Sequence, residues 1–456
     1  MIDTLRFITC GSVDDGKSTL IGRLLYETKL IFEDQLEALK ADSRKFGTQG
    51  ERIDFALLVD GLQAEREQGI TIDVAYRFFA TRKRRFIVAD TPGHEQYTRN
   101  MATGASTAQA AVLLIDARKG VLTQTKRHSR IVSMLGNRHV ALAVNKMDLV
   151  GWSQPVFDEI ELAYRRFAQD LGFETITAIP LSALEGHNIV ERDYDSMPWY
   201  EGPSLMQWLE SVPIQDGEFS KGFVMPVQWV NRPNLDFRGF SGRVASGNIR
   251  PGDRVRLTPS GVTSRIREIS CWGGPKAEAR AGESITLVLE DEVDASRGDV
   301  IATPSSPVEA ADQFEADLLW MSEHALLPGR PYAALIHTKS TNVTITEIKY
   351  RLDINTGAHL AAKTLGLNEI ARINVSFDRL VAFAPYSENQ KLGAFIIIDK
   401  LTHETVGAGL IHFALRRSVN VHWQALELTK TARAAMKHQK ARCLWFTGLS
   451  GSGLWW

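Results

Sequence analysis

The run Gly11-Ser12-Val13-Asp14-Asp15-Gly16-Lys17-Ser18 decides the fold expected for this chain. It matches the pattern G-x-x-x-x-G-K-[ST] in full and comes directly after an apolar stretch, Leu5 to Cys10. A strand, a glycine-bounded loop and a helix in this order form a cradle whose backbone N–H groups point at a phosphate group. We therefore predict a phosphate-binding loop here, followed by a helix from Ser18 to Leu25.

Two side chains of this loop carry its chemistry. Lys17 is expected to neutralise the β- and γ-phosphates of a nucleotide, and the Ser18 hydroxyl is expected to bind Mg²⁺. The glycines at either end of the run let the backbone curl around the phosphates. The residues predicted to contact phosphates from this loop are Gly11, Ser12, Val13, Asp14, Asp15, Gly16, Lys17, Ser18 and Thr19.

Composition places the chain among ordinary globular proteins. Its 456 residues exceed what one hydrophobic core usually organises, so we expect about three domains. Hydrophobic residues make up 44% and charged residues 23% of the sequence. The 53 Lys and Arg nearly balance the 54 Asp and Glu, so no overall basic charge points to nucleic acid as a partner.

The sequence also indicates a compartment. Cys10, Cys271 and Cys443 are far apart and fit neither a metal-binding spacing nor a disulfide framework, as expected in a reducing environment. The N-terminus has no signal region, and the longest apolar runs fall far short of the roughly 20 residues that a membrane span needs. We expect a cytoplasmic protein without a membrane partner.

A second motif follows the apolar strand predicted at Phe86 to Ala89. It reads Asp90-Thr91-Pro92-Gly93-His94, and all five residues are expected near the phosphates. An acid at the end of a buried strand can hold Mg²⁺ through water, and a glycine N–H can contact the γ-phosphate. We assign these roles to Asp90 and Gly93, and we expect His94 to orient the attacking water.

The long segment from Tyr26 to Thr71 separates the first helix from the second strand. In nucleotide-binding folds a segment at this place is usually a switch, ordered by the γ-phosphate and Mg²⁺. We call it the switch segment and expect the hydroxyl of Thr71 to bind the metal. The predicted catalytic set is Lys17, Thr71, Gly93 and His94, and the predicted metal ligands are Ser18, Thr71 and, through water, Asp90.

A third motif, Asn145-Lys146-Met147-Asp148, follows the predicted strand Val140 to Val144. Open α/β sheets bind ligands at the carboxyl ends of their strands. Asp148 can accept two hydrogen bonds from guanine N1–H and its 2-amino group, and adenine has no donor at either place. Asn145 would tie the base site to the phosphate loop, while Lys146 covers the ring.

A fourth motif follows the strand predicted at Ile176 to Pro180. The backbone N–H groups of Ser182, Ala183 and Leu184 are expected to contact the guanine O6. Four motifs in this order, each at the end of a predicted strand, indicate a domain that binds and hydrolyses GTP with Mg²⁺. The predicted guanine-binding residues are Asn145, Lys146, Met147, Asp148, Ser182, Ala183 and Leu184.

The chain changes character after residue 212. Short alternating segments are separated by turns at intervals of about ten residues, a spacing that indicates antiparallel barrels. The predicted fold is an α/β P-loop GTPase domain followed by two all-β barrels. The expected domains are 1–212 (GTP-binding), 213–308 (first barrel), 309–418 (second barrel) and 419–456 (basic linker tail).

The tail ends in the glycine half of another phosphate loop, Gly448 to Gly453. Leu454 occupies the position that needs lysine, and Trp455 occupies the position that needs a hydroxyl. We therefore expect no second nucleotide site in this polypeptide.

The chain resembles GTPases of the elongation factor Tu superfamily, which have a GTP-binding domain followed by two barrels. Within that superfamily it closely resembles the GTPase subunit of the two-subunit bacterial sulfate adenylyltransferase over about residues 1 to 418. The resemblance is carried by four runs: Gly11 to Leu25, Ile31 to Gly50, Leu58 to Val74 and Ala89 to Ala105. The tail resembles the junction to a fused adenylylsulfate kinase, truncated before the kinase lysine.

This resemblance implies a partner and a coupled reaction. In the family, this subunit hydrolyses GTP while a catalytic small subunit joins the AMP moiety of ATP to sulfate and releases pyrophosphate. We therefore expect a heterodimer or larger complex, with no adenylylsulfate kinase activity in this chain. The alternative is a translation elongation factor that delivers aminoacyl-tRNA, and tight, salt-dependent tRNA binding would support it.

Overall fold

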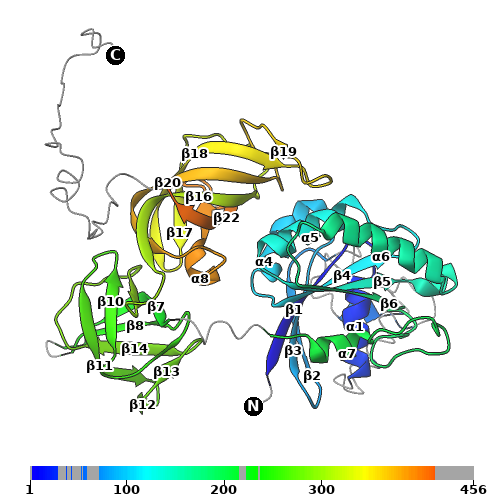
Figure 1. Cartoon of the computed structure of the whole chain (residues 1–456), viewed down its shortest axis with the longest axis horizontal. Coiled ribbons are helices and arrows are strands. Elements are labelled where there is room, and N and C mark those ends of the chain that lie inside the picture. Colours follow the sequence, from blue (N-terminus) through cyan, green and yellow to red (C-terminus); the bar gives the residue numbers. More distant parts are fainter. Residues whose placement is uncertain are drawn as a thin grey trace, which may run out of the picture. The chain divides into compact units, whose positions relative to one another are not determined.

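The first sheet has six strands in the order β2-β3-β1-β4-β5-β6 (Figure 1). All neighbouring pairs are parallel except β2 with β3. The computed structural model describes residues 3–28, 37, 43, 53, 55–58, 71–214, 222–234 and 237–415. The strands of the first sheet are β1 (Thr4–Cys10), β2 (Ala75–Ala80), β3 (Arg85–Asp90), β4 (Ala110–Asp116), β5 (His139–Asn145) and β6 (Thr175–Pro180).

Parallel strands buried on both faces read as continuous apolar runs, and the inner strands β4 and β5 show this pattern. Every residue of β4 and β5 is buried. The strands expected from the sequence therefore appear within one or two residues of their predicted ends. The helices of this region are α1 (Lys17–Glu27), α4 (Thr98–Ala105), α5 (Thr123–Met134), α6 (Gln154–Ala168) and α7 (Leu205–Ser211), with short 3-10 turns η1 (Phe55–Leu58), η2 (Glu95–Tyr97) and η3 (Met147–Val150).

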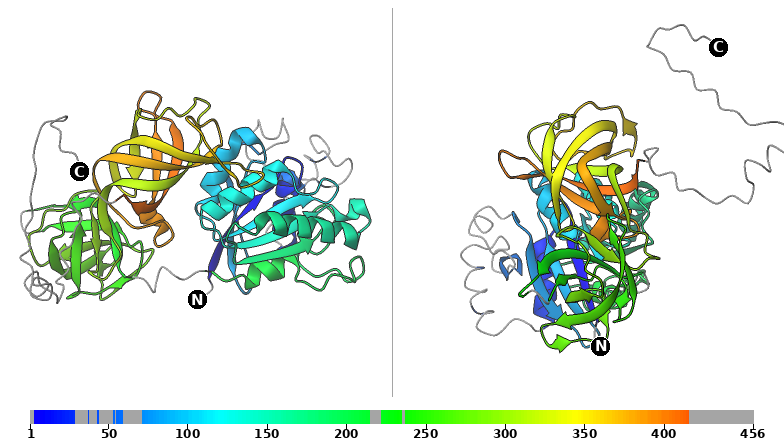
Figure 2. Two further views of the ribbon diagram at one scale, coloured as in Figure 1. Left: turned by 45° about the horizontal axis from the view of Figure 1, so that its top comes forward. Right: turned by 90° about the vertical axis from the view of Figure 1, so that its left-hand side faces the viewer.

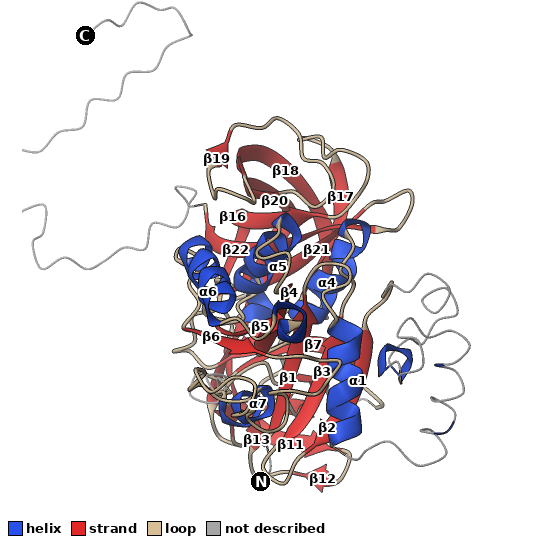
Figure 3. Cartoon of the chain, turned by 90° about the vertical axis from the view of Figure 1, so that its right-hand side faces the viewer, coloured by secondary structure: helices blue, strands red, loops and turns tan. Residues whose placement is uncertain are grey.

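The described residues after 222 form strands, with one short helix, α8 (Gln390–Gly393) (Figure 3). Six strands of the second sheet run β10-β15-β7-β8-β14-β11, and a further pairing of β10 with β11 closes them into a barrel (Figure 2). These elements are β7 (Val224–Asn231), β8 (Gly239–Arg243), β9 (Asn248–Ile249), β10 (Arg254–Thr258), β11 (Thr263–Cys271), β12 (Gly274–Pro275), β13 (Ala279–Arg280), β14 (Ser284–Leu289) and β15 (Val300–Ala302).

A second barrel closes in the same way. Its strands run β17-β21-β22-β16-β20-β18, and β17 pairs back with β18. Both barrels enclose their own cluster of buried apolar side chains. The elements are β16 (Glu309–Trp320), β17 (Pro331–Ile336), β18 (Lys339–Leu352), β19 (His359–Leu360), β20 (Ile370–Phe383), β21 (Ala394–Ile398) and β22 (Thr405–Ala414). The predicted α/β domain followed by two barrels is confirmed.

One hairpin differs from the sequence prediction. Tyr332 to Thr338 reads as one strand, but β17 ends at Ile336, which pairs with Lys339 at the start of β18. The two residues between them make the turn, and His337 has a φ of 41°. Two-residue hairpin turns require positive φ, so the chain reverses at His337 and Thr338, where the sequence prediction continues the strand.

No helix among the described residues is long and apolar enough to cross a membrane. Two predicted segments lie outside the described residues. These are most of the switch segment before Thr71 and the whole of the tail after residue 415.

Candidate functional site

The phosphate loop connects β1 to α1, as its sequence predicts. Gly16 is the N-cap of α1 and has a φ of 92°, a left-handed conformation that favours glycine. A Cβ at this position would lie 2.5 Å from the Nδ2 atom of Asn145. Both the backbone conformation and this close approach therefore require glycine, and they bring the third motif against the first.

The Lys17 side chain folds back over its own loop. Its ammonium group donates hydrogen bonds to the carbonyl oxygens of Gly11 at 3.2 Å and Ser12 at 2.8 Å. The side chain is buried, and this burial lowers the pKa of Lys17 while the carboxylates of Asp90 and Asp15 oppose the shift. A buried ammonium is thus held over the loop that is predicted to cradle phosphates.

The three residues predicted to hold the metal lie together. The Ser18 hydroxyl donates to Oδ2 of Asp90 at 2.9 Å and lies 3.3 Å from the Thr71 hydroxyl. Asp90 is fully buried at the end of β3, and burial raises its pKa against the opposing charge of Lys17. Hydroxyl and carboxylate oxygens are the ligands that Mg²⁺ prefers, so this donor set fits the ion.

The second motif lies against the phosphate loop and the strand that precedes it. Thr91 and Pro92 are buried, and the Thr91 hydroxyl donates to the backbone oxygen of Thr9 at 2.6 Å. Gly93 lies against the loop, because a Cβ there would be 2.6 Å from Nζ of Lys17 and 2.8 Å from the nitrogen of Val13. Only glycine lets the backbone come this close to the loop.

His94 is exposed directly after this glycine. Its Nδ1 accepts a hydrogen bond from the backbone N–H of Gln96 at 3.3 Å, so the side chain caps η2. An Nδ1 that accepts carries no proton, and the neutral ring therefore has its proton on Nε2.

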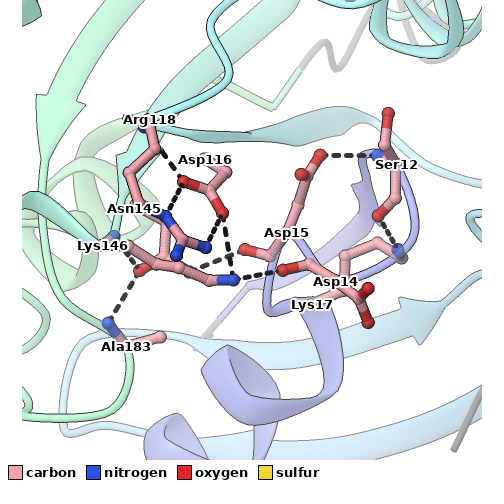
Figure 4. A network of polar contacts seen from close by, with 9 residues as sticks. All are labelled: Ser12, Asp14, Asp15, Lys17, Asp116, Arg118, Asn145, Lys146 and Ala183. Atoms are coloured by element: carbon pink, nitrogen blue, oxygen red, sulfur yellow. Dashed lines mark hydrogen bonds and ion pairs between the residues drawn. The ribbon is translucent and has the colours of Figure 1, made fainter. Parts of the chain in front are cut away.

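Asn145 joins three parts of the site (Figure 4). Its amide nitrogen donates to the backbone oxygen of Asp15 at 2.7 Å. Its side-chain oxygen accepts from the N–H groups of Lys146 at 2.8 Å and Ala183 at 2.9 Å. Because Asn145 is only 2% exposed, one side chain fixes the first, third and fourth motifs relative to one another.

Lys146 adopts a left-handed backbone conformation, with a φ of 63°. Its ammonium group donates to the backbone oxygen of Asp14 and forms an ion pair with Oδ2 of Asp116 at 3.1 Å. The stem of this lysine is therefore anchored at its tip, as a side chain that covers a base would need to be.

Asp116 and Arg118 are functional candidates that the motif analysis missed. Arg118 donates to both carboxylate oxygens of Asp116, at 3.0 and 2.6 Å, and Lys146 contacts the same carboxylate (Figure 4). Burial opposes the ionisation of Asp116, but these hydrogen bonds outweigh it and hold its pKa well below the usual range. One sequence feature could have identified Asp116: it is an acid at the carboxyl end of a buried parallel strand, where ligands bind in such sheets.

The other residues predicted for the guanine site differ in burial and in hydrogen bonding. Asp148 is half-buried in η3, whereas the side chain of Met147 is fully buried in the core, which leaves only its backbone at the site. The N–H groups of Ser182 and Ala183 donate within the protein, to the oxygen of His187 and to Asn145. The Leu184 carbonyl accepts from Arg23 on α1.

Replacing Asn145 with alanine tests this bridge. The variant leaves the Asp15 carbonyl and the Ala183 N–H without their partner, so we expect the free energy of unfolding to fall by about 1 to 3 kcal/mol. We also expect GTP affinity to weaken by about tenfold or more, because the base site loses its tie to the phosphate loop. Urea unfolding and equilibrium GTP titration measure the two effects.

Asn137→Ala is the matched control. Asn137 is also buried, and among the described residues its side chain donates to the carbonyl oxygens of Ala105 at 3.0 Å and Val132 at 3.5 Å, which lie outside the four motifs. It should lower stability and leave GTP affinity nearly unchanged. If both variants are folded to the same extent and bind GTP with equal affinity, Asn145 does not tie the base site to the phosphate loop.

The fold and the site define a P-loop GTPase of the elongation factor Tu type. Residues 3–214 match the model of the elongation factor Tu GTP binding domain, and residues 313–412 match the GTP-eEF1A C-terminal domain-like model. The chain thus binds and hydrolyses GTP.

Relatives identify the particular family. The chain is 60% identical to the bifunctional enzyme NodQ of Rhizobium sp. (strain N33), over 98% of this chain and 69% of that enzyme. It is 55% identical to the bifunctional enzyme CysN/CysC of Xylella fastidiosa, over 98% of this chain and 72% of that enzyme. It is 53% identical to sulfate adenylyltransferase subunit 1 of Saccharophagus degradans, over 91% of this chain and 88% of that subunit. The chain belongs to the family of sulfate adenylyltransferase subunit 1 and these bifunctional enzymes.

Proposed function

We propose that this chain is the GTPase subunit of a sulfate adenylyltransferase. In this role it couples GTP hydrolysis to the formation of adenylylsulfate from ATP and sulfate, a reaction carried out by a separate catalytic small subunit. The observation that supports the proposal is the match to a relative named subunit 1 over 88% of that relative's length. The assembled GTP site supplies the chemistry that such a subunit needs.

The phosphate side of the site is proposed to act as follows. Lys17 neutralises the β- and γ-phosphates, the N–H groups of the phosphate loop cradle them, and the Gly93 N–H contacts the γ-phosphate. His94 orients the attacking water through the proton on Nε2. Mg²⁺, held by Ser18, Thr71 and, through water, Asp90, would offset the negative charge of the phosphates.

The base side of the site selects guanine. Asp148 accepts hydrogen bonds from the base, and a site built for such bonds rejects an analogue that lacks them by as much as about 10⁴- to 10⁵-fold. Asn145, Lys146 and the backbone around Ala183 position the ring. The contacts of Lys146 with Asp116 and Asp14 hold its side chain in place.

Coupling is proposed to be a population shift. The GTP and GDP states differ in the ordering of the segment from Tyr26 to Thr71 and of the segment after His94, and the small subunit binds one of the two states better. We propose that the complex is a heterodimer or a larger assembly in the cytoplasm. Within this proposal, residues 1–212 form the GTPase domain, residues 213–308 and 309–418 form the barrels, and residues 419–456 form the tail.

The test is GTP hydrolysis by the purified chain, alone and with the small subunit, ATP and sulfate. We expect the rate to rise by at least about tenfold only when all three are present, because a partner completes the hydrolytic site. The control reactions omit sulfate, ATP or the small subunit one at a time. A hydrolysis rate that does not change with these components but rises with ribosomes or aminoacyl-tRNA would contradict the proposal and favour a translation factor.

A further inference from the structure

One acidic side chain of the phosphate loop is buried. Asp15 is only 1% exposed, and its Oδ2 accepts a hydrogen bond from the backbone N–H of Ser12 at 2.6 Å (Figure 4). The other carboxylate oxygen, Oδ1, is buried and has no hydrogen-bond partner among the described residues. A loop whose task is to attract phosphate thus contains an incompletely solvated carboxylate.

The cations near Asp15 have other partners as well. Lys17 is the strongest of them, but it also acts on Asp90 and donates its hydrogen bonds to Gly11 and Ser12. Lys119 is a weaker positive neighbour, and Asp116 is a negative one. Burial therefore raises the pKa of Asp15 above its ordinary value despite Lys17. The negative charge of this group is only partly compensated.

The hydrogen bond from Ser12 does not require a charge. The side-chain oxygen of an asparagine accepts a backbone N–H in the same way as a carboxylate oxygen. The hydrogen bond from Ser12 would therefore be kept by a neutral amide of the same size. What aspartate adds at this position is a negative charge within the loop that is predicted to bind the phosphates.

We propose that Asp15 sets the affinity for guanine nucleotides, because its buried carboxylate opposes the binding of the phosphate chain and accelerates nucleotide release. Like charges a few ångströms apart in a poorly solvated site repel strongly. The effect grows when Lys17 turns to the phosphates, since that cation then no longer compensates Asp15. The inference rests on guanine nucleotide binding alone and is independent of the proposed role in sulfate activation.

The charge makes nucleotide affinity depend on pH, with a defined sign. The bound phosphates raise the pKa of Asp15 further, so nucleotide binding is coupled to proton uptake by this carboxyl group. Below the pKa that Asp15 has in the nucleotide-free protein, its carboxyl group is neutral with and without nucleotide. The group then has no effect on nucleotide affinity. As pH rises from that pKa to the higher pKa of the nucleotide complex, affinity falls, and above both values the repulsion is complete.

The experiment compares the full chain with Asp15→Asn by equilibrium titration and dissociation of a fluorescent GDP at pH 5.5 and pH 8. At pH 8 the variant is expected to bind GDP about tenfold more tightly and to release it correspondingly more slowly. The difference should become smaller as the pH is lowered from 8 toward the raised pKa of the Asp15 carboxyl group. Asp158→Asn, which removes an exposed carboxylate on α6, is the matched control and should behave as the original chain.

A second measurement does not depend on the stability of the variant. Calorimetric GDP titration of the original chain in buffers of different ionisation enthalpy should show net proton uptake on binding, and absence of proton uptake at every pH tested would contradict the coupling. If Asp15 serves only to hold the loop, the variant binds GDP more weakly or equally well at both pH values, and this result overturns the inference. Absence of GDP binding by the original chain would instead contradict the assignment of the nucleotide site.

Discussion

Replacing Lys17 with alanine is expected to lower kcat/KM for GTP hydrolysis by about 10³-fold. Lys17 is the buried cation of the phosphate loop, and its ammonium group is held between the carbonyl oxygens of Gly11 and Ser12. Charge on the γ-phosphate oxygens in the transition state then has no preorganised positive partner. Phosphate release at saturating and subsaturating GTP, together with GTP titration, separates the loss of binding from the loss of rate.

Lys83→Ala is the control for this substitution. Lys83 pairs with Glu210 at 2.8 Å, but 73% of its side chain is exposed, so its loss should change neither stability nor hydrolysis appreciably. Because Lys17 also faces two buried carboxylates, thermal unfolding of both variants must accompany the kinetics. A folded Lys17→Ala protein that retains more than about a tenth of the original kcat/KM would refute the role assigned to this lysine.

Replacing Asp148 with asparagine is expected to weaken GTP binding by about 10²- to 10⁴-fold and to improve binding of xanthosine triphosphate. Guanine offers two donors to a carboxylate, whereas an asparagine presents one acceptor and one amide donor. Xanthine has a carbonyl oxygen where guanine has its amino group, so it can accept from that amide. Competition of GTP and xanthosine triphosphate against a fluorescent nucleotide measures the change.

This test separates base recognition from a general loss of structure. A variant that has lost the site binds neither nucleotide, whereas a variant with altered recognition exchanges one for the other. Asp158→Asn again provides an exposed acid on the same domain as the control. Unchanged preference for GTP in Asp148→Asn would show that Asp148 does not contact the base.

Local patterns in the sequence predicted the elements that bring the site together. The apolar run Ala111 to Ile115 becomes the central part of β4, whose seven residues are all buried. Ser18, Thr71 and Asp90 were assigned to the metal from their motifs, and the structure places their oxygen atoms in contact. Each of these predictions depended on residues next to a strand end or a loop glycine, where the backbone alone fixes the position.

The contacts that were missed are those between side chains from different elements. Asp116 is the last residue of β4 and Arg118 follows it, but the contact of Asp116 with Lys146 depends on the parallel pairing of β4 with β5. The sequence also predicts Asp15 among the phosphate contacts, but it does not reveal that the carboxylate is buried and accepts a hydrogen bond from the N–H of Ser12. A motif specifies which residue occupies a position, and three-dimensional packing decides which way its side chain points.

The pairing of β1 has a consequence for how the chain is made. β1 is synthesised well before its partners, which are β3, beginning at Arg85, and β4, beginning at Ala110. At about 5 to 20 residues per second, about 4 to 16 seconds pass between synthesis of Thr4 and synthesis of its partner Arg85. Leu5, Phe7 and Ile8, all fully buried or nearly so in the folded protein, lack the partner strands of β1 during that time. We expect the nascent chain to depend on chaperones until β4 has emerged.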